Sequence, residues 1–153
     1  MATVKSAPVL ALKGLKKRYS GKLVLDGISL SLAEHEVVCL IGASGSGKST
    51  LLRCADLLEP IDAGQISLEG ERVAFEDRNA DATRRKLGIV FQGFNLFPHL
   101  TVLENVALAP RVALSLTQAA AERRAKELLR SLGLAEKARE YPDALPAMRC
   151  ANV

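Results

Sequence analysis

The residues best suited to chemistry lie in one segment, residues 42–50, which reads Gly-Ala-Ser-Gly-Ser-Gly-Lys-Ser-Thr. It fits the pattern G-x-x-x-x-G-K-[ST], a glycine-rich loop whose backbone N–H groups surround phosphate groups. An apolar run, residues 37–41, precedes the loop, and a stretch compatible with a helix, residues 50–58, follows it. Strand, glycine-rich turn and helix in that order are the expected context of this motif. We therefore predict a site that holds a nucleoside triphosphate by its phosphates.

Each residue type in this loop suits one aspect of phosphate binding. Glycine accepts positive φ and has no Cβ, so the backbone can curve closely around an anion at the N-terminus of the next helix. Lys48 is placed to contact the β- and γ-phosphates, Ser49 offers a hydroxyl oxygen that suits Mg²⁺, and Thr50 adds a hydroxyl near the α-phosphate. The predicted phosphate-binding residues are Gly42, Ser44, Gly45, Ser46, Gly47, Lys48, Ser49 and Thr50.

The sequence around the loop predicts an α/β fold with two kinds of strand. The runs 37–41 and 87–91 are apolar throughout, as expected of parallel strands covered on both faces by helices. Residues 28–32 instead alternate Ile-Ser-Leu-Ser-Leu, which is typical of a half-buried antiparallel strand. Further short strands are predicted at residues 9–13, 23–25, 65–68 and 72–75, and the last two form a hairpin around Gly70.

A helix is predicted over residues 117–132. Ser115 or Thr117 can cap its start, and Gly133 is a natural residue just beyond its end. The side chains expected on its apolar face are Ala121, Ala125, Leu128, Leu129 and Leu132.

Composition limits the remaining function classes. The 153 residues suit one domain at most, and the net charge of +4 comes from scattered basic residues. We expect the basic clusters at 16–18, 84–86 and 123–124 to be solvated faces and not a nucleic-acid patch.

The cysteines and the apolar runs limit the cellular context. Cys39, Cys54 and Cys150 have no metal-binding spacing, which fits a reducing cytosol, and Cys39 is expected in a buried strand. No run approaches the ~20 apolar residues of a membrane span, so work at a membrane would need a partner.

The segment 87–106 narrows the class of nucleotide-binding protein. It reads Leu-Gly-Ile-Val-Phe-Gln-Gly-Phe-Asn-Leu-Phe-Pro-His-Leu-Thr-Val-Leu-Glu-Asn-Val. It resembles the Q-loop region of ABC transporter ATPases, and its sequence is similar to that of the importers of polar amino acids. Residues 51–64 fit the same subfamily. The resemblance runs over about residues 10–145. It implies an incomplete ABC ATPase domain: a P-loop NTPase core, with a parallel central sheet flanked by helices, beside an antiparallel β layer.

This resemblance implies ATP and Mg²⁺ as cofactors and adds two residues to the site. Tyr19 resembles the aromatic residue that stacks on adenine, although a strand-end tyrosine that packs locally is the alternative. Gln92 resembles the Q-loop glutamine, whose amide oxygen reaches Mg²⁺ or the attacking water. Lys48 and Gln92 are then the expected catalytic residues, and Ser49 and Gln92 the expected metal ligands.

The resemblance also implies partners. The segment after Gln92 would face a transmembrane permease subunit through Phe94, Leu96 and Phe97, unless these side chains only cover the local core. A second ATPase subunit would pair with the chain as a homodimer, and a solute-binding protein would act indirectly; no nucleic acid is expected. The implied location is peripheral, at the cytoplasmic face of the plasma membrane.

The end of the chain departs from the family pattern. Residues 141–145 resemble the lead-in to the signature motif, which relatives continue with Ser-Gly-Gly-Gln and later with the Walker B Asp and a catalytic Glu. Residues 146–153 read Pro-Ala-Met-Arg-Cys-Ala-Asn-Val. We expect residues 1–145 to be the N-terminal part of one ABC ATPase domain and residues 146–153 a non-family tail from truncation or a frameshift. ATP hydrolysis by this chain is then expected at no more than background.

Two other functions remain open from the sequence. One is a non-catalytic nucleotide-binding fragment, and the other is a non-transport ABC ATPase, for example in DNA repair or translation. A small-molecule kinase fits less well, because no segment resembles a lid over an acceptor.

Overall fold

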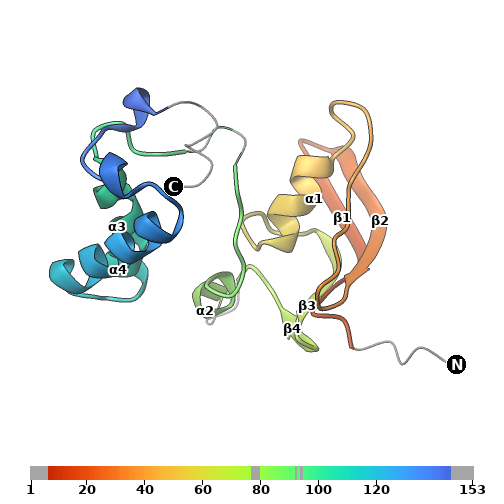
Figure 1. The fold of residues 1–153 in the computed structure, drawn as a ribbon. Helices are drawn as coiled ribbons and strands as arrows, with labels where there is room; N and C mark the ends of the chain where they lie inside the picture. Colours follow the sequence, from red (N-terminus) through yellow and green to blue (C-terminus); the bar gives the residue numbers. More distant parts are fainter. Residues whose placement is uncertain (1–6, 77–79, 92, 94, 146–153) are drawn as a thin grey trace, which may run out of the picture. The chain divides into compact units, whose positions relative to one another are not determined.

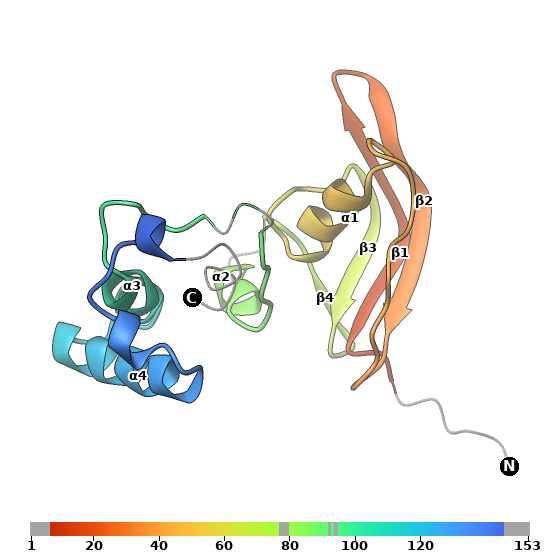
Figure 2. The same cartoon turned by 45° about the horizontal axis from the view of Figure 1, so that its top comes forward.

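The computed structural model describes residues 7–76, 80–91, 93 and 95–145. The chain divides into two compact units, Met1–Ile89 and Val90–Val153. Figures 1 and 2 show the strands and the phosphate loop in the first unit and a pair of helices in the second. Each unit has its own hydrophobic core.

The first unit is built on a four-stranded antiparallel sheet in the order β2-β1-β3-β4. Its strands are β1 (Leu10–Tyr19), β2 (Lys22–Leu32), β3 (Ala63–Leu68) and β4 (Glu71–Val73). The antiparallel layer predicted from the alternating pattern is therefore confirmed. The predicted hairpin is confirmed as well, because Leu68 pairs with Glu71 across a two-residue turn.

β2 is one continuous strand where the sequence predicted two. Gly27, which separates the predicted strands 23–25 and 28–32, lies inside β2 with φ +67°, where the ladder to β1 shifts register between Leu15 and Lys17. A glycine at positive φ serves a bulge as well as a turn, and here it bends the strand without ending it.

A close approach between the backbones of β1 and β3 requires glycine at position 64. Gly64, at the start of β3, has φ +103°, and a Cβ there would lie 2.6 Å from the carbonyl oxygens of Lys13 and Gly14. The backbones of β1 and β3 can approach this closely only because position 64 has no side chain.

Helix α1 (Lys48–Ala55) lies against one face of the sheet (Figure 2). It ends three residues earlier than the predicted limit of 58, and Leu57 follows with φ +55°. The buried residues that join helix and sheet are Leu12, Leu15, Leu25, Leu51, Cys54, Leu57 and Ile66. This core fixes the start of α1, and with it the phosphate loop, relative to β2.

The prediction of two parallel strands, at residues 37–41 and 87–91, is wrong for this structure. Residues 37–41 and 87–91 carry no strand pairing. Val37 and Ile41 are 87% and 96% exposed, and Cys39, expected in a buried strand, is exposed. An apolar run indicates a preference for burial, but a strand forms only beside a partner that takes up its N–H and C=O groups. The pairings among the described residues are all antiparallel.

A short helix, α2 (Ala80–Arg84), follows the sheet. Its Arg84 donates to the Leu57 carbonyl at 2.9 Å and stacks over Phe75 at 5.2 Å. Arg84 is therefore partly packed, whereas its neighbours in the basic cluster 84–86 are exposed as predicted.

The second unit pairs α3 (Val102–Ala113) with α4 (Gln118–Ser131), followed by two 3₁₀ turns, η1 (Ala135–Lys137) and η2 (Pro142–Ala144). The predicted helix 117–132 is confirmed. Thr117 is its N-cap, with its side chain accepting from the Ala120 N–H at 3.3 Å.

The apolar face of α4 is narrower than predicted. Ala121, Ala125 and Leu129 are buried at intervals of four residues, whereas Leu128 and Leu132 are 49% and 45% exposed. Since α3 covers only one stripe of a helix this long, the neighbouring stripe stays open to solvent.

Helix α3 was not predicted, although its start carries a capping box. The Thr101 hydroxyl accepts from the Glu104 N–H at 3.3 Å, and the Glu104 carboxylate accepts from the Thr101 N–H at 2.7 Å. The spacing Thr-x-x-Glu before an apolar run was the available signal. Within the described residues, no helix combines the length and apolarity needed to cross a lipid bilayer.

Candidate nucleotide-binding site

The predicted phosphate loop encloses a hollow of about 480 Å³ in the first unit. Its lining consists of Val24 of β2 and the residues Ser44, Gly45, Ser46, Gly47, Lys48, Ser49 and Thr50. The structure therefore brings together all the predicted phosphate-binding residues from 44 to 50. Gly42 is the first residue of the same loop, and its carbonyl oxygen accepts a hydrogen bond from the Lys48 ammonium.

Glycine is required where the loop meets the sheet. Gly47 is the N-cap of α1 with φ +92°. A Cβ at this position would lie 3.1 Å from both the Leu25 Cδ2 and the Val24 carbonyl oxygen. Gly45 also has positive φ, +79°, but faces open space. A side chain at position 47 would therefore prevent the loop from packing directly on β2 there.

The Lys48 ammonium lies inside the loop. Its Nζ donates to the carbonyl oxygens of Gly42 at 2.8 Å and Ala43 at 2.7 Å, and lies 3.4 Å from the Ser46 Oγ. These contacts hold the backbone of the loop around a positive charge. A phosphate oxygen is a stronger, charged acceptor for the same ammonium.

The start of α1 favours an anion. The helix begins at Lys48, no side chain caps it, and its first turn contains no acidic residue. The free N–H groups and the positive end of the helix dipole therefore face the hollow without competition from a carboxylate.

The chemistry of the loop fits Mg²⁺ bound together with phosphates. Ser49 is exposed in the first turn of α1, so its hydroxyl oxygen is accessible. Among the described residues, no group of three or more His, Cys, Asp or Glu side chains is arranged to hold a metal ion. Mg²⁺ commonly takes only one or two protein oxygens and completes its shell with phosphate oxygens and water, and Ser49 suits that mode.

Tyr19 ends β1 and is 40% exposed. The Nζ of Lys17 lies 5.1 Å from the centroid of its ring. Lys17 is itself buried, with its Nζ 2.9 Å from a Glu59 carboxylate oxygen and 2.7 Å from the Pro60 carbonyl oxygen. The prediction that the cluster 16–18 is a solvated face is therefore wrong at Lys17.

Sequence reasoning missed Lys17, although a signal existed. Leu15, Lys17 and Tyr19 alternate along β1, and alternate residues of a strand face the same side; Leu15 is fully buried on that side. The hydrogen bond with Glu59 raises the pKa of Lys17 above its usual value, against the opposing effect of burial. The same hydrogen bond lowers the pKa of Glu59. Both groups are therefore charged at neutral pH.

Gln92 and Phe94 lie outside the described residues. In the second unit, Leu96 is half-buried and Phe97 is 47% exposed, with its ring edge-on to His99 at 5.9 Å. Asn105 of α3 fixes the backbone at Phe97, accepting from its N–H at 2.8 Å and donating to its carbonyl at 3.1 Å. Asn105 is a second residue that sequence reasoning missed.

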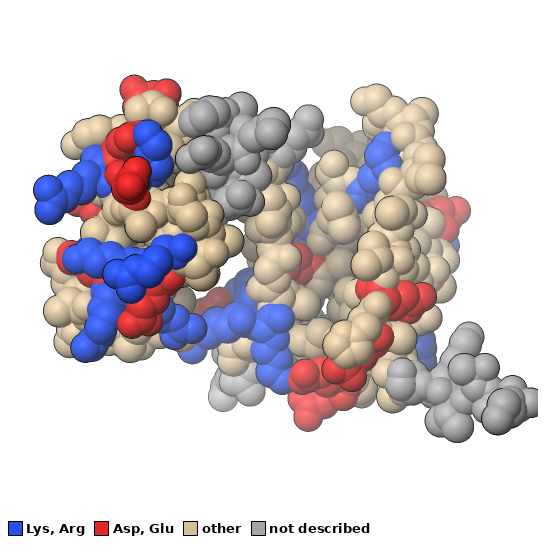
Figure 3. All heavy atoms as spheres, viewed as in Figure 1, with Lys and Arg blue, Asp and Glu red and all other residues tan. Residues whose placement is uncertain are grey.

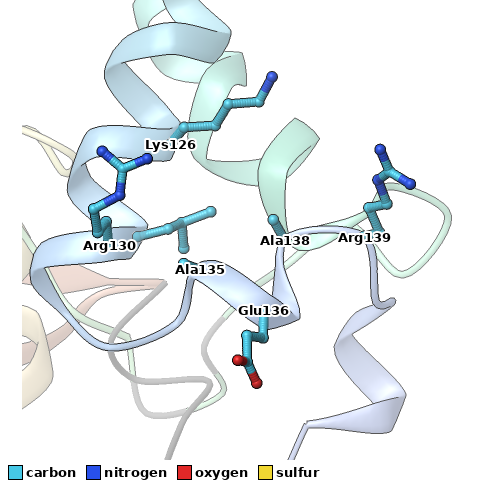
Figure 4. A pocket seen from close by; sticks show the side chains of 7 residues that line it. Lys126, Arg130, Ala135, Glu136, Ala138 and Arg139 are labelled. Atoms are coloured by element: carbon cyan, nitrogen blue, oxygen red, sulfur yellow. The ribbon is translucent and has the colours of Figure 1, made fainter.

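The second unit has a hollow of its own, of about 340 Å³, between α4 and η1. Figure 4 shows Lys126 and Arg130 projecting from α4, with Glu136 directed away from them. Both basic and acidic side chains lie along α4, and Figure 3 shows them over that part of the surface. The exposed cluster 123–124 belongs to this mixed face and was predicted to be solvated.

The comparisons with known proteins agree with this geometry. The family model described as "ABC transporter" matches residues 25–148. The arginine transport ATP-binding protein ArtM of Bacillus subtilis is 43% identical over 137 residues, covering 90% of this chain and 57% of the relative. The glutamine transport ATP-binding protein GlnQ of Escherichia coli is 44% identical with the same coverage. The chain thus spans a little over half the length of these relatives.

Solved structures give the same fold. The ATP-binding cassette MJ0796, in a dimeric post-hydrolysis state bound to ADP and phosphate, matches with a TM-score of 0.76 and 31% identity, covering 94% of this chain and 67% of that chain. The cbiO1 protein of Clostridium perfringens, at 23% identity, has a TM-score of 0.78 and covers 96% of this chain and 59% of that one. The fold class predicted from the sequence is therefore confirmed, although the parallel pairings are not formed here.

Proposed function

The chain belongs to the ABC transporter family, and on that premise we propose that it binds ATP as the nucleotide-binding part of an importer for amino acids. The observation that carries the proposal is the glycine-rich loop closed around Lys48 at the start of α1. The names of the relatives, arginine and glutamine transport ATP-binding proteins, support amino acids as the solute class.

In this proposal the phosphates occupy the hollow lined by residues 44–50. Lys48 exchanges its bonds to loop carbonyls for bonds to the β- and γ-phosphates, since charged acceptors form the stronger bonds. Tyr19 stacks on the adenine ring, because a partly exposed aromatic face at a strand end suits a planar base. Gln92 senses the γ-phosphate, as the family resemblance implies.

Mg²⁺ would be held by the Ser49 hydroxyl together with phosphate oxygens, and Gln92 would add its amide oxygen. The ion would supply positive charge that offsets the charge developing on the phosphates during transfer. Ser49 places a hydroxyl at the helix start, where the backbone N–H groups also face the phosphates.

We further propose that the 153-residue chain alone hydrolyses ATP at no more than background. The side chains that line the phosphate hollow supply an ammonium and hydroxyls, which bind and neutralise charge. Hydrolysis also needs a group that deprotonates water, and the described residues that line the hollow include no carboxylate or histidine. Steady-state phosphate release measures the point: turnover that is abolished by Lys48→Ala would contradict the proposal.

The proposed partners are a transmembrane permease, a second ATPase subunit and, indirectly, a solute-binding protein, with the chain peripheral to the cytoplasmic face of the plasma membrane. The exposed ring of Phe97, on a backbone fixed by Asn105, offers an apolar contact for the permease. Replacing Phe97 by Ser should reduce co-purification with a transmembrane permease subunit co-expressed with this chain. Retention of the permease at the wild-type level would argue against this contact.

The central test is the affinity for ATP. Removing the Lys48 ammonium deletes charge-assisted bonds of about 1.5–3 kcal/mol, so Lys48→Ala should weaken ATP binding by about 10- to 150-fold in calorimetry. Lys13→Ala is the matched control, because Lys13 is an exposed lysine of β1 outside the hollow. Equal dissociation constants for the Lys48 variant and the wild type would refute the proposal.

A further inference from the structure

Lys17 is a buried cation in the first unit, outside the lining of the phosphate hollow. Its side chain is 7% exposed, and its Nζ lies 2.9 Å from a Glu59 oxygen, 2.7 Å from the Pro60 carbonyl oxygen and 5.1 Å from the centre of the Tyr19 ring. An ammonium removed from water needs such partners to stay charged. It therefore occupies a fixed position over one face of the ring.

The loop that carries Glu59 and Pro60, the partners of Lys17, is hydrogen-bonded to β1. Glu59 and Pro60 lie in the loop that follows α1, and this loop is bonded to the end of β1 at a further point. The Asp62 N–H donates to the Lys16 carbonyl at 2.9 Å, and the Arg18 N–H donates to an Asp62 carboxylate oxygen at 2.5 Å. These two hydrogen bonds tie the loop that carries Glu59 and Pro60 to the end of β1.

The geometry points to Lys17 as a positioning residue for the base: its ammonium, fixed by Glu59 and Pro60, holds the Tyr19 ring in the orientation that accepts adenine. This inference rests on the proposed ATP-binding function and deepens it. With the ammonium near the ring, the remaining exposed part of Tyr19, 40% of the residue, is available for a base. A cation over a ring favours a single ring placement, so the base finds its stacking surface already oriented.

A neighbouring ion pair on the same strand shows that this arrangement is particular to Lys17. Lys16 lies 2.9 Å from Asp26, but the two side chains are 51% and 63% exposed, on the opposite side of β1. The pair Lys16–Asp26 therefore has the same charges and a similar distance with no aromatic partner. It is a matched control for the pair Lys17–Glu59.

The experiment separates base recognition from phosphate recognition. Dissociation constants for ATP and for inorganic tripolyphosphate are measured by calorimetry on the full chain. The test variant is Lys17→Met with Glu59→Gln, which removes both charges together and leaves no unpaired buried ion. The control variant is Lys16→Met with Asp26→Asn. A third variant is Tyr19→Leu alone, and a fourth adds Tyr19→Leu to the test variant.

The test variant should bind ATP about 3- to 10-fold more weakly, the loss expected when neither the Lys17 ammonium nor the Glu59 carboxylate, which also hydrogen-bonds with the Tyr19 side chain, orients the ring. Its affinity for tripolyphosphate should equal that of the wild type, and the control variant should match the wild type for both ligands. The variant that carries Tyr19→Leu as well should bind ATP no more weakly than Tyr19→Leu alone, because without the ring the Lys17 ammonium has nothing to orient. Equal weakening for both ligands, or unchanged ATP affinity, would overturn the inference.

A measurement on the unmodified chain covers the case in which the test variant does not fold. ATP should slow hydrogen exchange of the amides in residues 57–62 more than tripolyphosphate does, because stacking on Tyr19 stabilises the contacts behind the ring. Identical protection by both ligands would contradict the inference. If the unmodified chain binds neither ligand, the proposed function itself fails, which is a distinct result.

Discussion

Replacement of Gly47 by alanine should damage the phosphate loop in a way that its neighbour Gly45 does not. Both glycines have positive φ, +92° and +79°. A residue with a Cβ pays about 1–2 kcal/mol for such a conformation. Only at Gly47 would the new Cβ also meet the sheet, at 3.1 Å from the Leu25 Cδ2 and the Val24 carbonyl oxygen.

The difference between the two variants isolates the contact with β2. Forcing extra volume against packed atoms costs about 1–3 kcal/mol, so Gly47→Ala should lose about 2–5 kcal/mol in total and Gly45→Ala about 1–2 kcal/mol. The entropy that alanine removes from the unfolded chain is the same for both and cancels. Gly47→Ala should also weaken tripolyphosphate binding, because relief of the contact moves the loop N–H groups.

The assay must report on the first unit. Hydrogen exchange of the β1 and β2 amides across a urea series gives the free energy of opening for that sheet. Far-ultraviolet circular dichroism of both variants checks that the strands are retained. If the two variants differ by less than about 0.5 kcal/mol, the range of ordinary surface substitutions, the contact of Gly47 with β2 has no energetic weight and the argument fails.

Three further outcomes are expected. Gly64→Ala should destabilise the sheet far more than Gly70→Ala in the same hydrogen-exchange assay. Both glycines have positive φ, but only at position 64 would the new Cβ lie 2.6 Å from backbone oxygens. Equal losses of stability would contradict this. Thr101→Val should destabilise α3 by about 0.5–2 kcal/mol, because the hydroxyl that caps the helix is lost. The loss should appear as faster amide hydrogen exchange in the first turn of α3, and unchanged exchange there would count against the capping box. Backbone and side-chain hydrogen bonds from Thr101 hold the pKa of Glu104 below its ordinary 4.5, so its stabilising effect is present above that value and is lost as the pH falls through the folded pKa. Glu104→Gln should therefore destabilise α3 at neutral pH and cease to do so in strong acid, and a difference that persists in acid would refute the assignment.

Much of the site was predictable because its chemistry is local. The loop from Gly42 to Thr50 carries its own turn residues, its cation and its hydroxyls within nine consecutive positions. The hairpin around Gly70 and the helix capped by Thr117 were predictable for the same reason. In each case the residues that determine the backbone conformation lie next to one another.

The failures concern interactions between distant segments. Residues 37–41 are apolar enough for a buried strand, but pairing depends on a partner that the run itself does not specify. Lys17 appeared to belong to a solvated cluster, because its acceptors, Glu59 and Pro60, lie more than forty positions away. Helix α3 was not predicted, although the Thr-x-x-Glu spacing at Thr101 is a local signal of a helix start.

The separate cores of the two units have a consequence for how the chain reaches its folded state. The helices α3 and α4 are joined by a short connection and pack through nearby residues. The sheet instead pairs Leu10 with Leu68, across most of the first unit. Contacts between distant residues require closure of long loops and form more slowly than local ones. The helical unit should therefore form first, and the phosphate loop, which depends on the sheet for its shape, should become able to bind only in the slower phase.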